Sequence, residues 1–304
     1  MNVIEELRKM VIEKLPINDK VRKAWKGVYS PLLGPELTSA NILSLAPHLS
    51  EVFYSTTPQN KKKKRNQKNV SVAGRRWEAL ITWYINLCCV GSRVIAFQGL
   101  KNVPKIIKDA VSVTYGTLPC TAEPDIIVLV FPDRPIYTSA DELSLFKTKR
   151  GKLDSSIINE QVTADFNLME IGIIQCKTNW NENAQIPMLW DIIYRTPLGN
   201  LQGIKVGTPP YSIQYIPFSY SFVTVPTTSD LEEITPTSVC VARVKNLSGG
   251  NYWGMQSKAG IALSLDYIFQ TNFTSGFDDG NINISLNKAI PLLKRRKDYY
   301  YFFK

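Results

Sequence analysis

The chain has 304 residues, of which 44% are hydrophobic and 20% charged, and its formal net charge is +10. This composition supports a packed core and excludes global disorder, collagen and simple repeats. No apolar run approaches the ~18 residues that a membrane-spanning helix needs, and the five cysteines lack the spacing of a zinc ribbon or a disulfide framework. We therefore expect a cytoplasmic protein.

The N-terminal part of the chain is predicted to be helical. Apolar residues recur at helical spacing over 2–15, and a second helix is expected over 19–28. Shorter helical turns are expected over 39–45 and 49–54. A longer, buried helix is predicted over 74–88, where large apolar residues repeat on one face: Trp77, Leu80, Ile81, Tyr84 and Cys88.

The pattern then changes to that of strands. A short strand is predicted over 94–98, and two strong strands are predicted over 123–131 and 168–177. Between the two strong strands lies a polar insertion, 132–166, that is rich in turn residues and charges. The core of the protein is therefore expected to be α/β.

The rest of the chain extends this core. A helix is predicted over 184–194 and further strands over 211–225 and 238–244. Because no repeat or clear linker interrupts the sequence, we expect a single elaborated domain. Its predicted parts are a helical N-terminal region with a basic loop (1–73), a core with a mixed central sheet flanked by helices (74–225) and a β-rich C-terminal elaboration (226–304).

Basic residues are concentrated in three stretches, 61–76, 134–152 and 294–304, and the remainder of the chain is acidic. The first stretch holds eight basic residues and no acidic one. Such a distribution is typical of a protein that binds a polyanion such as nucleic acid, although a solvated loop can have the same composition. The DNA contacts predicted on this ground are Lys61, Lys62, Lys63, Lys64, Arg65, Arg75 and Arg76.

Polar side chains stand at the ends of the two strong strands. Asp125 opens the first strand after Glu123 and Pro124, and Gln175 and Lys177 close the second. A period of two places Gln175 and Lys177 on one face of the sheet, with Cys176 on the other. A lysine at the end of a buried strand needs a carboxylate or a phosphate as partner. On the residues alone, Lys177 could also extend its ammonium group into solvent at a sheet edge.

These residues resemble the P-D…(D/E)-x-K motif of type II restriction endonucleases. The resemblance covers about 74–225: a helix bearing Glu78, a strand with Asp125, a strand ending at Lys177, and a following helix. It implies a restriction-endonuclease-like core. This chain departs from the pattern in two ways, because Gln175 replaces the usual acid and the insertion 132–166 separates the two strands.

The resemblance also implies a chemistry, the hydrolysis of DNA phosphodiester bonds with Mg²⁺, for which Mn²⁺ could substitute. Asp125 would be the central metal ligand, together with the side-chain oxygen of Gln175, the backbone carbonyl of Cys176 and the carboxylate of Glu78. Lys177 would hold the attacking water. Since Mg²⁺ prefers oxygen ligands and keeps several waters, the neutral Gln175 would make the site more dependent on Glu78.

The implied partners are double-stranded DNA, a second copy of the chain and a companion DNA methyltransferase, with no membrane partner. Thr178, Asn179 and Asn181 follow Lys177 and could contact DNA, but turns favour such residues in any case. Two other functions remain open at this point. One is a structure-specific nuclease acting on repair intermediates or junctions, and the other is a DNA-binding protein without catalysis, in which Asp125 and Lys177 are structural.

Overall fold

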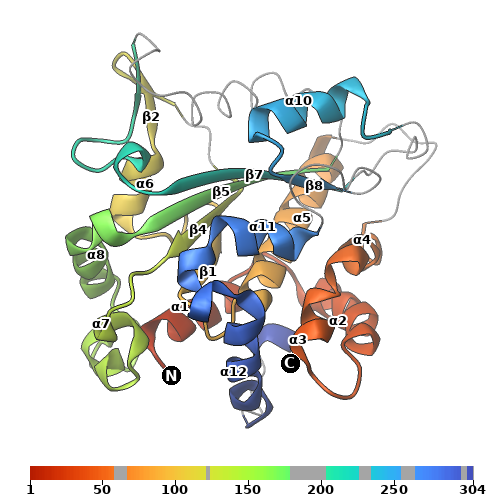
Figure 1. The fold of residues 1–304 in the computed structure, drawn as a ribbon, viewed down its shortest axis with the longest axis horizontal. Coiled ribbons are helices and arrows are strands. Elements are labelled where there is room, and N and C mark those ends of the chain that lie inside the picture. The colour runs from red at the N-terminus through yellow and green to blue at the C-terminus, as the bar shows by residue number, and fades with distance from the viewer. Residues whose placement is uncertain are drawn as a thin grey trace.

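The structure is a computed structural model, organised around a five-stranded mixed sheet (Figure 1). The residues that it describes are 1–57, 67–120, 124–178, 203–225, 234–254, 264–295 and 300–303. The strand order is β1-β4-β5-β7-β8, in which β1, β4 and β5 are antiparallel and β5, β7 and β8 are parallel. The strands are β1 (Val94–Gln98), β4 (Ile126–Val130), β5 (Glu170–Lys177), β7 (Phe218–Thr224) and β8 (Tyr252–Gly254).

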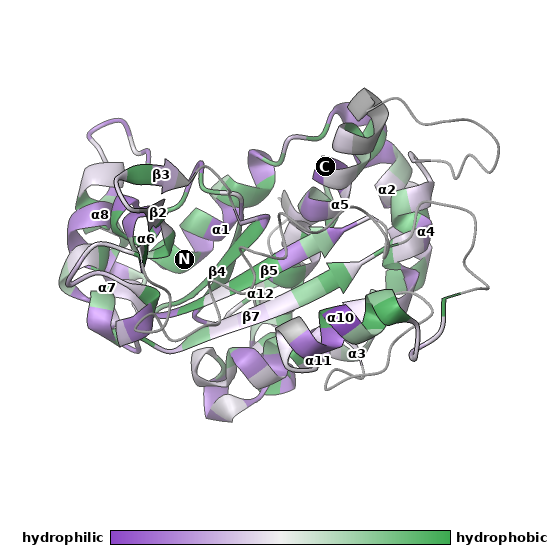
Figure 2. Cartoon of the chain, turned by 90° about the horizontal axis from the view of Figure 1, so that it is seen from above, coloured by the Kyte–Doolittle hydropathy of each residue, from purple (hydrophilic) through white to green (hydrophobic). Residues whose placement is uncertain are grey.

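Both faces of this sheet are covered, which explains why its central strands read as continuous apolar runs. In β4, Ile126 and Val128 point into one hydrophobic cluster, whereas Ile127 and Leu129 point into a second cluster on the opposite face. All five residues of β4 are buried. Figure 2 shows the apolar character of β4 between helices whose surfaces are mixed. The predicted strands 94–98, 123–131 and 168–177 are thus confirmed, with ends shifted by a few residues for the last two.

The first face of the sheet is covered by the long helix α5 (Gln67–Cys88). The indole Nε1 of Trp77 donates a hydrogen bond to the backbone carbonyl of Val223 in β7 (3.3 Å), and Trp77 is fully buried. This contact fixes the orientation of α5 over the sheet. The other helices that bury residues in the same cluster are α2 (Asp19–Leu33), α3 (Ser39–Leu43), α4 (Leu49–Tyr54), α11 (Leu265–Asn272) and α12 (Ile282–Arg295).

The second face is covered by α1 (Val3–Glu13), α6 (Lys105–Val111) and elements of the segment 132–166. That segment was predicted as a polar insertion, but it forms α7 (Pro135–Thr138), α8 (Ser155–Ala164) and two short 3₁₀ turns (141–146 and 166–168). Its apolar residues are buried against the sheet: Tyr137, Phe146, Ile158, Val162 and Phe166. The prediction missed this because the apolar residues are widely spaced among charges. A small second sheet, β3-β2-β6, consists of β3 (Leu118–Cys120), β2 (Val113–Tyr115) and β6 (Ile204–Val206).

The edge strand β1 is closed by side chains rather than by another strand. The fully buried Arg8 of α1 donates hydrogen bonds to the carbonyls of Val94 (2.6 Å) and Ser92 (3.0 Å), and it forms an ion pair with Glu5 (3.1 Å). The Asn86 side chain of α5 pairs with both backbone groups of Ala96 (2.8 and 3.2 Å). Satisfying these groups removes a free edge at which another chain could pair.

The C-terminal part differs from the prediction. The predicted strand 238–244 is part of the helix α10 (Val239–Ser248), so the expected β-rich elaboration is wrong for the described residues beyond 233, where β8 is accompanied by α10, α11 and α12. Three valines over 239–244 favour a strand locally. However, Gly249 (φ 62°) ends a helix there, and the amide of Gly250 donates to the carbonyl of Lys245 (2.7 Å).

The aromatic C-terminus forms a 3₁₀ turn at Tyr300–Phe302, and Tyr301 and Phe303 are buried in the core. The predicted helix over 184–194 lies outside the described residues. None of the described helices is both long and apolar enough to cross a membrane.

Candidate active site

Four strands place polar residues at the same end of the sheet. The register pairs Gln98, the last residue of β1, with Ile126, the first residue of β4, and pairs Ile126 with Ile174 near the end of β5. In the next strand, Lys177 lies beside Thr224, the last residue of β7. Because β1, β5 and β7 end where β4 begins, the predicted residues Asp125, Gln175 and Lys177 come together at this edge.

Asp125 lies immediately before β4 and is held by both neighbouring strands. Its side-chain Oδ2 accepts a hydrogen bond from the backbone amide of Cys176 in β5 (2.8 Å). Its backbone carbonyl accepts one from the amide of Gly99, directly after β1 (2.9 Å). The carboxylate is half-buried. These two contacts fix Asp125 at the centre of the sheet edge.

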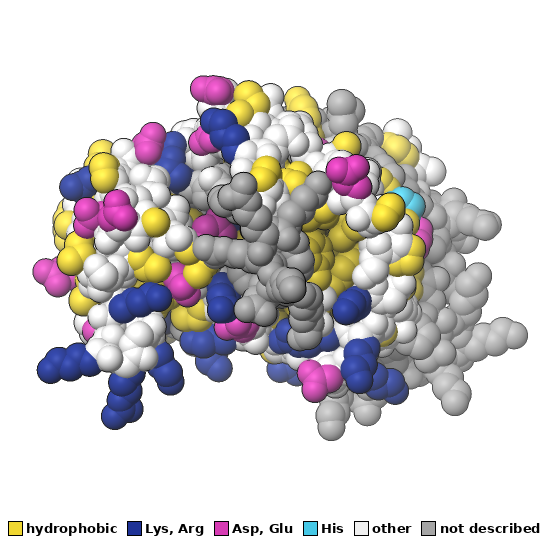
Figure 3. Space-filling model, turned by 90° about the horizontal axis from the view of Figure 1, so that it is seen from below, with side chains coloured by type: hydrophobic (Ala, Val, Ile, Leu, Met, Phe, Trp, Pro, Cys, Tyr) yellow, Lys and Arg dark blue, Asp and Glu magenta, His cyan; other side chains and the backbone are white. Residues whose placement is uncertain are grey.

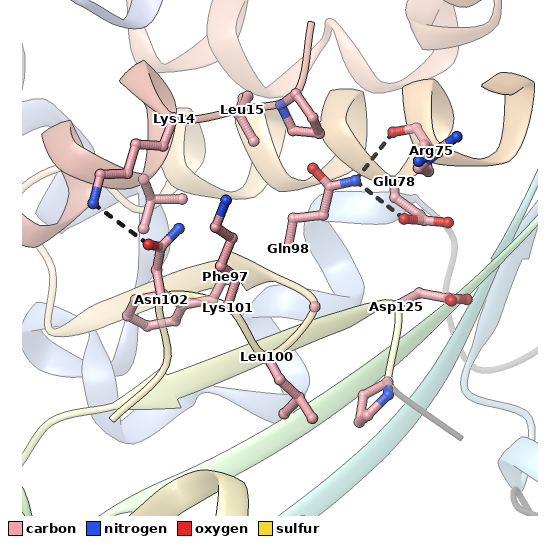
Figure 4. Close-up of a pocket in the computed structure, with 14 residues that line it drawn as sticks. Lys14, Leu15, Arg75, Glu78, Phe97, Gln98, Leu100, Lys101, Asn102 and Asp125 are labelled. Atoms are coloured by element: carbon pink, nitrogen blue, oxygen red, sulfur yellow. Dashed lines mark hydrogen bonds between the residues drawn. The ribbon is translucent and has the colours of Figure 1, made fainter. Parts of the chain in front are cut away.

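Glu78 reaches the same place from α5. It follows Trp77, whose contact with β7 orients the helix, and it is half-buried. Gln98 donates through Nε2 to the Glu78 carboxylate (3.1 Å) and to the backbone carbonyl of Arg75 (3.1 Å). Glu78 and Asp125 line one pocket of about 290 Å³, and in Figure 4 their carboxylates point to the same side.

The electrostatics of the two carboxylates show that they interact. Burial raises the pKa of Glu78 to about 7, and the negative charge of Asp125 adds to this rise. The Gln98 hydrogen bond and the charges of Arg75 and Lys177 oppose it. Burial also raises the pKa of Asp125, against the charge of Lys177 and the Cys176 amide. Two poorly solvated carboxylates that repel each other are an arrangement that a divalent cation would stabilise.

The end of β5 has the alternation that the sequence predicts. Cys176 packs into the hydrophobic cluster beneath α5, and burial raises the pKa of its thiol well above the usual range. Cys176 is therefore a core residue and not a nucleophile. Gln175 (6% exposed) and the half-buried Lys177 point to the opposite face. Extending the β4–β5 register by one residue places Gln175 directly opposite Asp125.

These residues suit a hard cation such as Mg²⁺. Asp125 and Glu78 offer carboxylate oxygens to one pocket, which matches the preference of Mg²⁺ for few protein ligands and several waters. The Gln175 amide lies beside Asp125 in the register but is not among the residues that line this pocket. No group of three or more His, Cys, Asp or Glu that could hold a metal occurs among the described residues.

The predicted DNA contacts have different outcomes. Lys61, Lys62, Lys63, Lys64, Arg65, Asn179 and Asn181 lie outside the described residues. Arg75 is exposed at the rim of the pocket, whereas Thr178 is buried. The guanidinium of Arg76 donates to the backbone carbonyl of Thr56 (2.6 Å), which ties α5 to the end of α4. The second basic stretch is partly used inside the protein, because Arg134 pairs with Asp165 and Lys147 with Glu6.

Gln98 is a site residue that the sequence interpretation missed. It is a polar residue at the end of a buried strand, the same signal that singled out Lys177. Its role depends on the β1–β4 register and on the position of α5, which a sequence does not show. Lys14 and Lys101, which also line the pocket, come from two segments with no motif (Figure 4).

Two comparisons with known proteins return no match: no protein-family model matches the sequence, and no curated protein matches it.

Proposed function

We propose that this protein is a Mg²⁺-dependent endonuclease that hydrolyses double-stranded DNA at a short specific sequence, with a core like that of type II restriction endonucleases. The order α5, β1, β4, β5 and β7, in which three antiparallel strands are followed by a parallel one, supports the resemblance that the sequence suggests. The gathering of Asp125, Gln175, Lys177 and Glu78 at one sheet end supports it further.

The observation that carries the proposal is the position of the charged groups: Asp125, which accepts a hydrogen bond from the Cys176 amide at the end of β5, and Glu78 line one pocket. Asp125 raises the pKa of Glu78, and Lys177 lowers the pKa of both carboxylates. The two carboxylates line one pocket beside the sheet edge, and the charge of Lys177 acts on both of them from the end of β5. This combination of a cation-binding pair with an adjacent ammonium group is suited to phosphate chemistry.

The residues then have separate roles. Asp125, Glu78 and the Gln175 side chain would hold the cation, whose charge, when bound, would offset the negative charge that develops on the phosphate oxygens. Lys177 lies on the same face of β5 as Gln175 and donates a hydrogen bond to the attacking water or to a phosphate oxygen. The water oxygen forms a bond to phosphorus, and the bond between phosphorus and the leaving sugar oxygen breaks. The attacking water releases one proton, and the leaving oxygen takes up one proton.

The wider expectations depend on the same resemblance. A homodimer places two such sites on the two strands of a duplex, because two-fold symmetry in the protein matches two-fold symmetry in a palindromic site. A companion methyltransferase that protects host DNA, and a cytoplasmic location, belong to the same proposal.

The proposal is tested by digesting a supercoiled plasmid with Mg²⁺ or Mn²⁺, using the native chain, Asp125→Asn and Asp133→Asn. Asp133 is an exposed aspartate beyond the other end of β4, so its variant controls for the loss of one charge. We expect discrete fragments from the native chain and from Asp133→Asn, and none from Asp125→Asn.

Three results would contradict the proposal. Equal cleavage by Asp125→Asn would show that the site is elsewhere. Cleavage restricted to branched DNA would favour a junction nuclease. A plasmid that is bound but stays intact with either metal would favour a DNA-binding protein without catalysis.

A further inference from the structure

A basic hollow lies next to the candidate site, outside the three basic stretches of the sequence. It has a volume of about 250 Å³ and shares Lys14, Lys101 and Asn102 with the pocket that contains Glu78 and Asp125. The two hollows therefore adjoin each other at these three residues. The second hollow is lined by four lysines and no acidic residue, and we call it the lysine groove: Lys14, Lys101, Lys105 and Lys108 are its basic residues.

One short segment, 98–108, connects the site to the lysine groove. At its start Gln98 donates to the Glu78 carboxylate, and the amide of Gly99 donates to the backbone carbonyl of Asp125. Farther along, the amide of Lys105 donates to the side-chain Oδ1 of Asn159 in α8 (2.7 Å). Because the segment is anchored to the site at one end and to α8 toward the other, its lysines have a defined position relative to the carboxylates.

Two of these lysines are available to bind an anion. Lys105 pairs with Asp109 (2.8 Å), and Lys14 donates weakly to Asn102 (3.5 Å). Lys101 is exposed and Lys108 half-buried, and neither forms an ion pair with any residue that the structure describes. In Figure 4 the Lys101 side chain rises between Asn102 and Gln98. Figure 3 shows that Lys and Arg side chains also gather along the lower edge of one face of the molecule.

The geometry points to the lysine groove as the surface that binds the phosphate backbone of the DNA strand entering the candidate active site. This inference rests on the proposed function and adds the path of the substrate to it. The pocket with Glu78 and Asp125 suits a cation and the scissile phosphate, whereas the adjoining lysine groove suits the next phosphates of the same strand. Each strand of duplex DNA carries a charge about every 3.4 Å along its axis, so it offers such a row of anions.

The test measures DNA binding without cleavage. The native chain, Lys101→Met/Lys108→Met and a control, Lys20→Met/Lys23→Met, are titrated with a fluorescent 30-base-pair duplex in EDTA at several salt concentrations. Lys20 and Lys23 are exposed on α2, on the opposite side of the molecule from α6 (Figure 1), and their loss changes the net charge equally. The positions of Lys101 and Lys108 on the protein surface favour folded variants, which the unfolding midpoint verifies.

We expect the groove variant to bind the duplex more weakly, by up to about eightfold per lysine at 0.1 M salt, whatever the DNA sequence. The slope of the logarithm of its DNA association constant against the logarithm of the salt concentration is expected to be smaller in magnitude than that of the native chain by about two. The slope of the control variant is expected to equal that of the native chain. Binding and slope equal to those of the control would overturn the inference, even if the native chain cuts DNA. Groove-dependent binding by a native chain that cuts nothing would support the groove and contradict the proposed nuclease.

Discussion

Replacing Glu78 by Gln should stabilise the metal-free protein at high pH. At pH 8.5 the native chain must keep an ionised Glu78 in a poorly solvated position near Asp125. Gln has the shape of the protonated acid but carries no charge, and it keeps an oxygen that can accept the hydrogen bond of Gln98. The variant therefore removes the repulsion without removing the contact.

The size and sign of the effect follow from the pKa. One pKa unit corresponds to about 1.4 kcal/mol, so the rise of the Glu78 pKa from 4.5 to about 7 corresponds to at most about 3 kcal/mol. The folded state binds this proton more tightly than the unfolded state does. The contribution of Glu78 to the free energy of unfolding is thus fully present below pH 4.5, and it is lost as the pH rises through the folded-state pKa of about 7.

The assay is denaturant unfolding in EDTA at pH 4.5, 6 and 8.5. We expect Glu78→Gln to equal the native chain near pH 4.5 and to exceed it by about 2 to 3 kcal/mol at pH 8.5. Glu160→Gln, at an exposed position of α8, controls for the loss of one carboxylate. The reasoning is refuted if Glu78→Gln gains no stability at pH 8.5, or gains the same amount at every pH.

Three further outcomes are expected. Arg8→Met should lower the free energy of unfolding by about 3 kcal/mol, because Glu5 and the carbonyls of Ser92 and Val94 lose the buried guanidinium. Calorimetry measures this loss of stability, and a loss below about 1 kcal/mol would contradict the prediction. Gln98→Met should raise the pKa of Glu78 further, because it removes the hydrogen bond that Gln98 donates, and should weaken Mn²⁺ binding severalfold in titration calorimetry. An unchanged Mn²⁺ affinity would exclude a role of Gln98 in positioning Glu78. Native Mn²⁺ affinity should rise from pH 6 to 8 as Glu78 loses its proton, and in Glu78→Gln this rise should be smaller; identical pH profiles would argue against Glu78 as a ligand.

The sequence predicts the centre of the fold better than its margins. The strands β1, β4 and β5 could be predicted because they are short apolar runs bounded by turns and polar residues, and α5 because its large residues repeat on one face. The segment 132–166 and the helix α10 could not, for different reasons. The segment 132–166 buries widely spaced apolar residues that follow neither a helical nor a strand period. The helix α10 is rich in valine, which favours strands, and its end depends on Gly249.

The candidate site likewise contains residues that the sequence predicts and residues that only the structure shows. Asp125, Gln175 and Lys177 were predicted together because each stands at a strand end and the strands are neighbours. Gln98 and the lysine groove depend on the register of β1 and on the path of the segment 98–108, which only a three-dimensional structure provides. The roles of the predicted site residues in catalysis remain predictions.

The cleavage rate of Lys177→Met, measured when metal and DNA are both bound, tests the nuclease proposal most directly. Lys177 is the one member of the cluster assigned to the chemical step rather than to the cation, and Lys20→Met serves as the control. We predict that Lys177→Met binds Mn²⁺ and duplex DNA nearly as the native chain does but cuts at least about a hundredfold more slowly. Cleavage at the native rate would contradict the assignment.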